Sequence, residues 1–231
     1  MIFRRIPRSW IAAVLVSALA IGAGAQIPLS EFAQALYSIP VSNPDFILSS
    51  IELGIAQPDF PASALLRLIE RLGGHPAPAF EKEALLLVLA HASEDGLPIE
   101  GLVSKALEGL ARNIPPQAIE QGLSARMNLL AETRDLLYAK GIFSAPFGAS
   151  LSVATAIPME RFNQLLIHIS EPIGDFLEGG GSPFDGHVLY QEVRNRLTQL
   201  QGVTLLVEDV ELVLDRIDPS DLTQVALAAV S

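Results

Sequence analysis

Residues 95–141 read DGLPIEGLVSKALEGLARNIPPQAIEQGLSARMNLLAETRDLLYAKG, and this stretch decides the fold. In its first part, apolar residues recur at steps of three and four with polar residues between them, which is the pattern of an amphipathic helix. Asn113 can adopt the left-handed conformation that closes a helix, and Pro115 and Pro116 forbid its continuation. A second helix with the same spacing then runs to Gly141.

The two segments together predict a helical hairpin. Pro98 stands where the first turn of a helix tolerates proline, because the first N–H groups have no partner within the helix. The second helix carries one apolar stripe, formed by Ile119, Leu123, Met127, Leu130 and Leu137. Because the connection is short, we expect two antiparallel helices that bury their stripes on each other and on a third element.

Segments with the same helical spacing of apolar residues precede and follow this hairpin, and Pro, Gly, Asn and Asp separate them. We therefore predict an all-α fold, a stack of about nine or ten antiparallel helices around a central hairpin. Such a stack can be superhelical. The sequence shows no repeat of fixed length, so it indicates no particular repeat family. Pro172 should kink or end the helix that starts at Met159. Branched residues over Val203–Val207 allow a strand, but helical spacing across the segment favours a helix.

The expected organisation has four parts. Residues 1–25 form a leader, 26–141 an N-terminal helical stack that includes the hairpin, and 159–231 a C-terminal helical part. Residues 142–158 carry no charge and show no period, so they are expected to connect the two helical parts.

The leader has the features of a secretory signal peptide. Its basic start contains Arg4, Arg5 and Arg8, and Trp10 begins an apolar run that is too short for a bilayer span of about 20 residues. Small residues then suit cleavage near Ala25/Gln26, so we expect Sec-type export of a bacterial protein to the periplasm or the exterior. The alternative is an uncleaved anchor. After cleavage, no contact with the membrane is expected.

Charge and composition exclude several classes of function. The chain has 15 basic and 26 acidic residues, and removal of the leader leaves 12 basic residues and a net charge of −14. Nucleic acids and anionic membranes attract clustered Lys and Arg, so neither is an expected partner. The chain has no cysteine, so an exported protein of this sequence is held by its core and not by disulfides.

One repeated motif offers a metal-binding alternative. His91-Ala92-Ser93-Glu94 and His168-Ile169-Ser170-Glu171 share the pattern H-x-S-E, and each follows an apolar helical run. Residues three apart share a helix face, so His91, Glu94, His168 and Glu171 could hold zinc, iron or manganese if the two helices faced each other. The simpler interpretation is that both motifs are solvated helix ends, which need no cofactor.

The first helix of the hairpin also carries a candidate partner-binding surface. Lys105, Glu108 and Arg112 follow each other at steps of three and four, so they share one face. Such residues form surface ion pairs in most helices, and the alternative is a surface for a protein partner.

Residues 96–123 resemble a segment of uncharacterised exported bacterial proteins with the skeleton GLPxxxLxxKxxEGxAxxxPP. The resemblance implies a helical hairpin and a bacterial envelope setting, and it implies no reaction. The sequence contains no cysteine nucleophile, nucleophile elbow or phosphate-binding loop. We therefore expect a non-catalytic interaction or scaffold protein with a protein partner in the envelope, and a metal-binding protein or metal-dependent enzyme is the alternative.

Overall fold

The structure is a computed structural model that describes residues 27–57, 60–145, 156–200 and 205–230. Within these residues it contains ten helices and two short strands, which confirms the predicted all-α class. The predicted leader and its predicted cleavage site lie outside the described residues.

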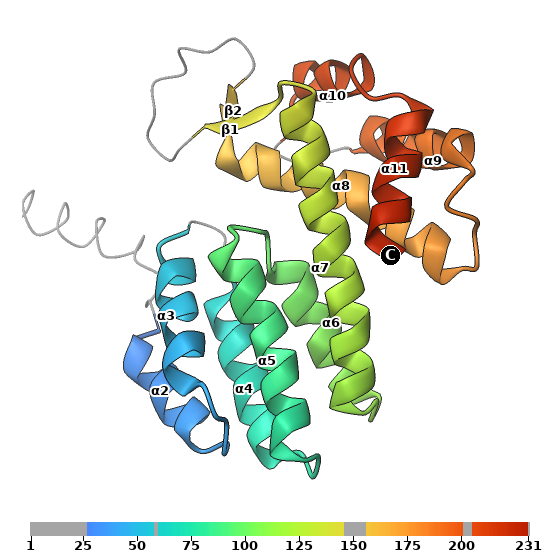
Figure 1. Ribbon diagram of the computed structural model, residues 1–231. Coiled ribbons are helices and arrows are strands. Elements are labelled where there is room, and N and C mark those ends of the chain that lie inside the picture. The colour runs from blue at the N-terminus through green and yellow to red at the C-terminus, as the bar shows by residue number, and fades with distance from the viewer. Residues whose placement is uncertain (1–26, 58–59, 146–155, 201–204, 231) are drawn as a thin grey trace, which may run out of the picture.

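The first half of the chain forms the lower part of the molecule in Figure 1. Its helices are α2 (Leu29–Tyr37), α3 (Pro44–Ile55), α4 (Ala62–Gly74), α5 (Ala79–Glu94), α6 (Glu100–Ala111) and α7 (Pro116–Ala139). Each helix packs on the helix two places along the chain, so that α2, α4 and α6 make one row and α3, α5 and α7 make a second. The rows join where α2 meets α3 and where α6 meets α7.

The second half of the chain forms the upper part of the molecule in Figure 1. Its elements are β1 (Phe143–Ala145), β2 (Ala156–Pro158), α8 (Met159–Glu178), α9 (Gly186–Gln199), α10 (Val207–Leu214) and α11 (Pro219–Val230). The α8, α9 and α11 helices pack on one another, and α8 and α11 also pack on α7. The long α7 helix therefore belongs to both halves, with α5 and α6 beside its first part and α8 and α11 beside its last part.

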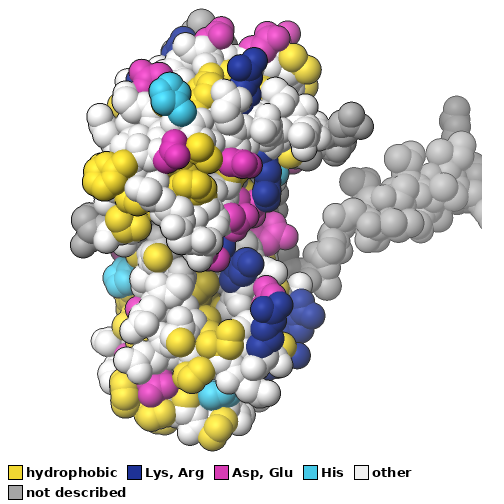
Figure 2. Space-filling view, turned by 90° about the vertical axis from the view of Figure 1, so that its right-hand side faces the viewer, with side chains coloured by type: hydrophobic (Ala, Val, Ile, Leu, Met, Phe, Trp, Pro, Cys, Tyr) yellow, Lys and Arg dark blue, Asp and Glu magenta, His cyan; other side chains and the backbone are white. Residues whose placement is uncertain are grey.

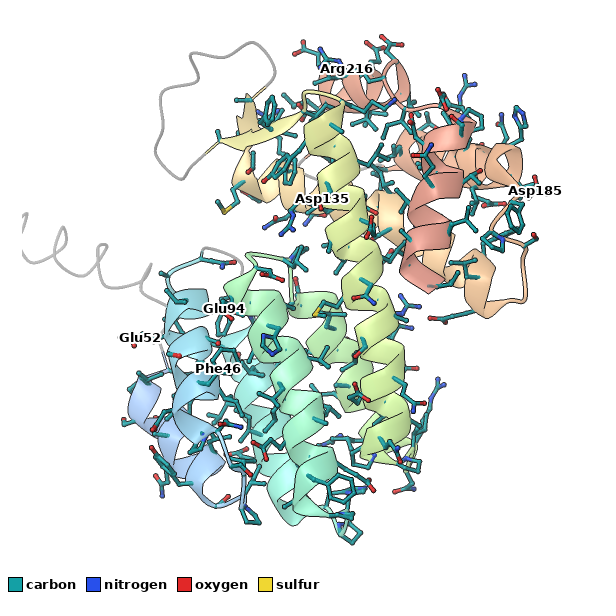
Figure 3. All side chains as sticks on the ribbon, in the orientation of Figure 1. Phe46, Glu52, Glu94, Asp135, Asp185 and Arg216 are labelled. Atoms are coloured by element: carbon teal, nitrogen blue, oxygen red, sulfur yellow. The ribbon has the colours of Figure 1, made fainter. Side chains whose placement is uncertain are left out.

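The helix ends follow from local sequence. Asn113 has a φ of 58°, and the N–H of Ile114 donates to the carbonyl of Gly109, so α6 closes with the left-handed residue that the sequence predicts. Gly141 closes α7 in the same conformation, with a φ of 75°. The guanidinium of Arg216 then donates to the carbonyls of Lys140 and Gly141, which ties the last helices to the end of α7 (Figure 3).

The α5 helix is buried on several sides, and Leu85, Leu86, Val88 and Leu89 all lie in the core. Two polar side chains near its start are also buried, Lys82 and Glu83. The Glu83 carboxylate accepts from the backbone N–H and the side-chain amide of Asn43, at 2.9 and 3.2 Å. Hydrogen bonds from the backbone of Ser42 first, and then from Asn43, hold the pKa of Glu83 below its ordinary value. This carboxylate thus fastens the start of α3 to α5.

Several details differ from the prediction. Pro98 lies before the start of α6 and not in its first turn, because the helix begins at Glu100. Pro172 does not end α8, which continues to Glu178; Pro172 is buried beside Ile173, and this packing outweighs the one missing N–H. The expected connection begins and ends with the parallel strands β1 and β2, and residues 146–155 between them lie outside the described residues.

The segment that could be strand or helix is helical from Val207 onward, where α10 begins. Leu205 and Leu206 precede the helix, and residues 203–204 are not described.

Candidate functional site

The outer face of α6 is open to solvent. Gly101, Ser104, Lys105 and Glu108 follow each other at steps of three, one and three, so they lie on the same side of the helix. All four are exposed, whereas Leu102 and the other apolar residues of the helix face the core. The end of the first row of helices therefore presents small and charged side chains.

The neighbouring face of α7 has the same character. Ala118, Gly122 and Arg126 follow each other at steps of four and share one side of this helix. Ile119 and Leu123 lie beneath them in the core. A Cβ added at Gly122 would have no heavy atom within 4 Å, so there is open space above this position.

A groove of about 250 Å³ runs between these two faces, which we call the hairpin groove. Its lining residues are Lys105, Gly109, Ile114, Ala118, Ile119, Gly122, Leu123, Arg126 and Glu178. Apolar side chains form most of this lining, and charged side chains stand at one end, where α8 comes over the hairpin.

A second hollow, of about 190 Å³, continues from the first and lies where the two halves of the molecule meet. We call it the junction cleft. Its lining residues are Pro98, Gly101, Leu102, Ser104, Lys105, Glu108, Arg126, Leu129, Leu130, Ile167, Ser170 and Glu171. Lys105 and Arg126 line both hollows, so the two form one continuous surface.

Figure 2 shows this side of the molecule. Hydrophobic side chains are exposed over its lower half, and Lys and Arg side chains gather along one edge beside them. Asp and Glu side chains lie among the cations at the height where the two halves meet. An apolar floor with a charged rim suits the binding of a protein segment.

The α6 part of the rim carries side chains of both charges. Glu108 contacts two cations, Arg112 at 2.6 Å and Lys105 at 3.9 Å. Glu100 is also exposed on this helix, so the four charged side chains of α6 and its end sum to zero. Arg112 is 70% exposed, and pairs this exposed contribute little to stability.

Arg126 fastens the two halves of the molecule to each other. Its guanidinium donates to Glu178 at 2.7 Å and to Asp175 at 3.3 Å, both at the end of α8. Its side chain is only 17% exposed, because it lies between the two hollows. From the other side, Arg196 on α9 contacts Glu171 at 2.5 Å and Asp175 at 3.9 Å.

The junction cleft contains some of the predicted partner-binding residues and one of the predicted metal ligands. Lys105 and Glu108, predicted to bind a partner, both line the junction cleft, and Arg112 lies beside them. Glu171, predicted as a metal ligand, lines the same cleft. Partner binding by these residues stays a prediction.

Sequence reasoning missed Arg126. Its position four residues after Gly122 could have been used for a prediction, because residues four apart share a helix face and Arg126 therefore places a charge on the open face of α7. Its contacts with α8 were not readable, since they join residues that lie far apart in the chain.

The four predicted metal ligands do not converge. His91 lies 3.7 Å from Glu94 at the exposed end of α5, and its ring contacts Phe46 with centroids 5.0 Å apart. Glu171 is paired with Arg196. Over the residues that the structure describes, no group of three or more His, Cys, Asp or Glu side chains could hold a metal ion.

His168 lies in a different environment from His91. Both of its ring nitrogens are buried without a hydrogen-bond partner. Burial lowers the pKa of His168 below 6.5, and Arg196 adds to this effect while Glu171 opposes it. The ring is therefore harder to protonate than that of an exposed histidine.

Comparison with protein-family models, with curated proteins and with solved structures finds no match. In the described part of the chain, no helix combines the length and the apolar character that a membrane span requires.

Proposed function

We propose that this chain is a non-catalytic interaction or scaffold protein of the bacterial envelope, and that it binds an amphipathic helix of a protein partner. The binding surface in this proposal is the hairpin groove with the adjoining junction cleft. The observation that carries the proposal is the continuity of these two hollows through Lys105 and Arg126.

The arrangement of the rows supports a helix as the occupant. Within each row of the lower half, every neighbour is a helix two places away in the chain. The α6 helix is the last of its row, and the outer face of α6 and α7 is the open end of the stack (Figure 1). A helix laid along the hairpin groove would continue this packing, which is the usual mode of helix recognition in a groove.

The chemistry of the rim supports a helix whose polar side carries both charges. The two hollows are lined by Lys105 and Arg126 and by the carboxylates of Glu108, Glu171 and Glu178. Charges separated by more than about 8 Å are screened at physiological ionic strength, so the local charge governs the contact. The envelope setting rests on the leader and on the resemblance of the hairpin to exported proteins.

The test is affinity capture from the native envelope fraction, with the exported protein as bait. We expect Gly122→Leu and Gly101→Leu to lose the captured partner, because each adds a side chain at the lining of a hollow, and its Cβ would meet no heavy atom within 4 Å. Gly74→Leu is the matched control, since this exposed glycine also has open space around it and lines neither hollow.

Two results would count against the proposal. One is capture of the same partner by the wild type and by both groove variants. The other is the absence of any specifically retained protein from an envelope fraction in which the bait is correctly folded, as checked by circular dichroism.

A further inference from the structure

A third hollow, of about 280 Å³, lies beside the last part of α7 and the start of α8. We call it the seam pocket, because residues from both halves of the molecule surround it. It shares no lining residue with the hairpin groove or the junction cleft. Small ligands bind preferentially in hollows between two parts of a protein, and such hollows measure about 300–1,000 Å³. The lining residues are Asp95, Gly96, Arg134, Asp135, Tyr138, Ser144, Met159, Phe162, Asn163 and Leu166.

One wall of the seam pocket is apolar. Phe162 and Leu166 on α8 are almost fully buried, and Met159 lies on the same face of this helix, three residues before Phe162. The ring of Tyr138 on α7 stacks on that of Phe162 with centroids 5.4 Å apart. This wall suits an apolar group of a ligand.

A pair of opposite charges on α7 also lines the pocket. Within the described residues, Arg134 donates through Nε to Oδ1 of Asp135 at 3.2 Å and through Nη1 to the carbonyl of Asp95 at 2.9 Å. Neither bond uses Nη2, and the Arg134 side chain is only 23% exposed. Asp135 is 65% exposed, and Figure 3 places it on α7 at the height where the two halves meet.

This arrangement is complementary to a zwitterion. A guanidinium and a carboxylate held side by side match the adjacent carboxylate and ammonium of an α-amino acid, so that each charge of the ligand faces its opposite. The Asp95 residue brings a second carboxylate to the lining, so the pocket carries more negative than positive charge. A ligand with a carboxylate and no ammonium group is therefore disfavoured.

We propose that the seam pocket binds a free α-amino acid with an apolar side chain. The ligand carboxylate accepts from Nη2 of Arg134, the ligand ammonium donates to Asp135, and the ligand side chain packs on Phe162 and Leu166. The inference goes beyond the proposed function and does not rest on it, because the partner helix is proposed to bind in the other two hollows.

The test is isothermal titration calorimetry of the exported protein with leucine, methionine and phenylalanine. At least one of them binds with a Kd below about 1 mM. The amide of that amino acid lacks the carboxylate and its N-acetyl derivative lacks the ammonium, so each binds at least about tenfold more weakly.

Two variants locate the site. Arg134→Gln and Asp135→Asn each weaken binding of the free amino acid by at least about tenfold, whereas Arg67→Gln and Asp215→Asn, matched changes at exposed positions outside the pocket, leave it unchanged. Because Arg134 also holds the carbonyl of Asp95, the exposed Asp135 gives the variant that separates binding from stability.

Three results overturn the inference. They are the absence of binding of all three amino acids, a derivative without one of the charges that binds as tightly as the free amino acid, and binding that Asp135→Asn leaves unchanged. None of these results bears on capture of a protein partner in the hairpin groove, so the proposed function is tested separately.

Discussion

Asn113 shows how one residue fixes the geometry of the hairpin. It is the only residue other than glycine with a positive φ in the described part of the chain. The N–H groups of Asn113 and Ile114 donate to the carbonyls of Leu110 and Gly109, which closes α6 and directs the chain into α7. The groove between the two helices therefore depends on a residue that does not line it.

We expect Asn113→Ala to lower the free energy of unfolding by about 1 kcal/mol, because a Cβ without a polar side chain is disfavoured in the left-handed region. Asn113→Gly should leave it unchanged or raise it slightly. Urea denaturation measures both. Asn128→Ala, at an exposed site within α7, is the control and should not destabilise. Equal stability of the Ala and Gly variants at position 113 would contradict the role of the conformation.

His168 makes stability depend on pH in one direction. Burial lowers its pKa in the folded protein, so the unfolded chain binds more protons once the pH falls below about 6.5. The free energy of unfolding is thus unaffected above that region and decreases as the pH falls from 6.5 toward the lowered pKa.

Urea denaturation at about pH 7.5 and about pH 5.5 measures this loss. His168→Leu should remove the part of the pH dependence that arises from the buried ring, and His187→Gln, at an exposed position, should not. A wild type that gains stability on acidification over this interval, or a leucine variant with an unchanged pH dependence, would refute the assignment.

At the scale of the elements, the glycines of α6 have opposite roles. A Cβ at Gly101 would meet nothing within 4 Å, whereas a Cβ at Gly109 would lie 2.8 Å from two side-chain carbons of Ile119. The first glycine leaves the junction cleft open, and the second lets α6 and α7 approach each other.

We therefore expect Gly101→Ala to raise the free energy of unfolding by about 0.5–1 kcal/mol, since alanine is the better helix former. Gly109→Ala should lower it by about 1–3 kcal/mol, because the added methyl overpacks the contact with Ile119. Thermal and urea denaturation of the two variants give both values. A stabilising effect of Gly109→Ala would mean that the helices are less closely packed than the structure shows.

The helices themselves were predictable, because their signals are local. Asn113 and Gly141 stop helices through their own conformational preferences, and apolar spacing identifies the buried stripe of α7 at Ile119 and Leu123. Pro172 was misread because its burial depends on how α8 packs, which no local signal contains. Weakly patterned sequence likewise hid the three-residue strands β1 and β2.

The candidate site was predictable only in part, for the same reason. Helical spacing put Lys105 and Glu108 on one face, and both line the cleft. The other wall of the cleft comes from α8, and the contact between Arg126 and Glu178 joins residues 52 positions apart. The two H-x-S-E motifs are alike in sequence, yet packing leaves His91 exposed and buries the ring nitrogens of His168.

At the scale of the whole molecule, α7 combines two architectures. Its first part ends a two-row stack, and its last part is the core of the upper helices. The upper half occupies one end of α7 and leaves the outer side of α6 and α7 open at the other. A partner helix is proposed to cover it.

The absence of cysteine from the chain allows a direct test of this contact. Gly122→Cys places a thiol in the hairpin groove, and Gly74→Cys places one at an exposed position that lines neither hollow. A bulky maleimide attached to Gly122→Cys should abolish capture of the envelope partner, and the same label on Gly74→Cys should not. Capture that survives the label at position 122, or that is lost equally with the label at position 74, would contradict the account.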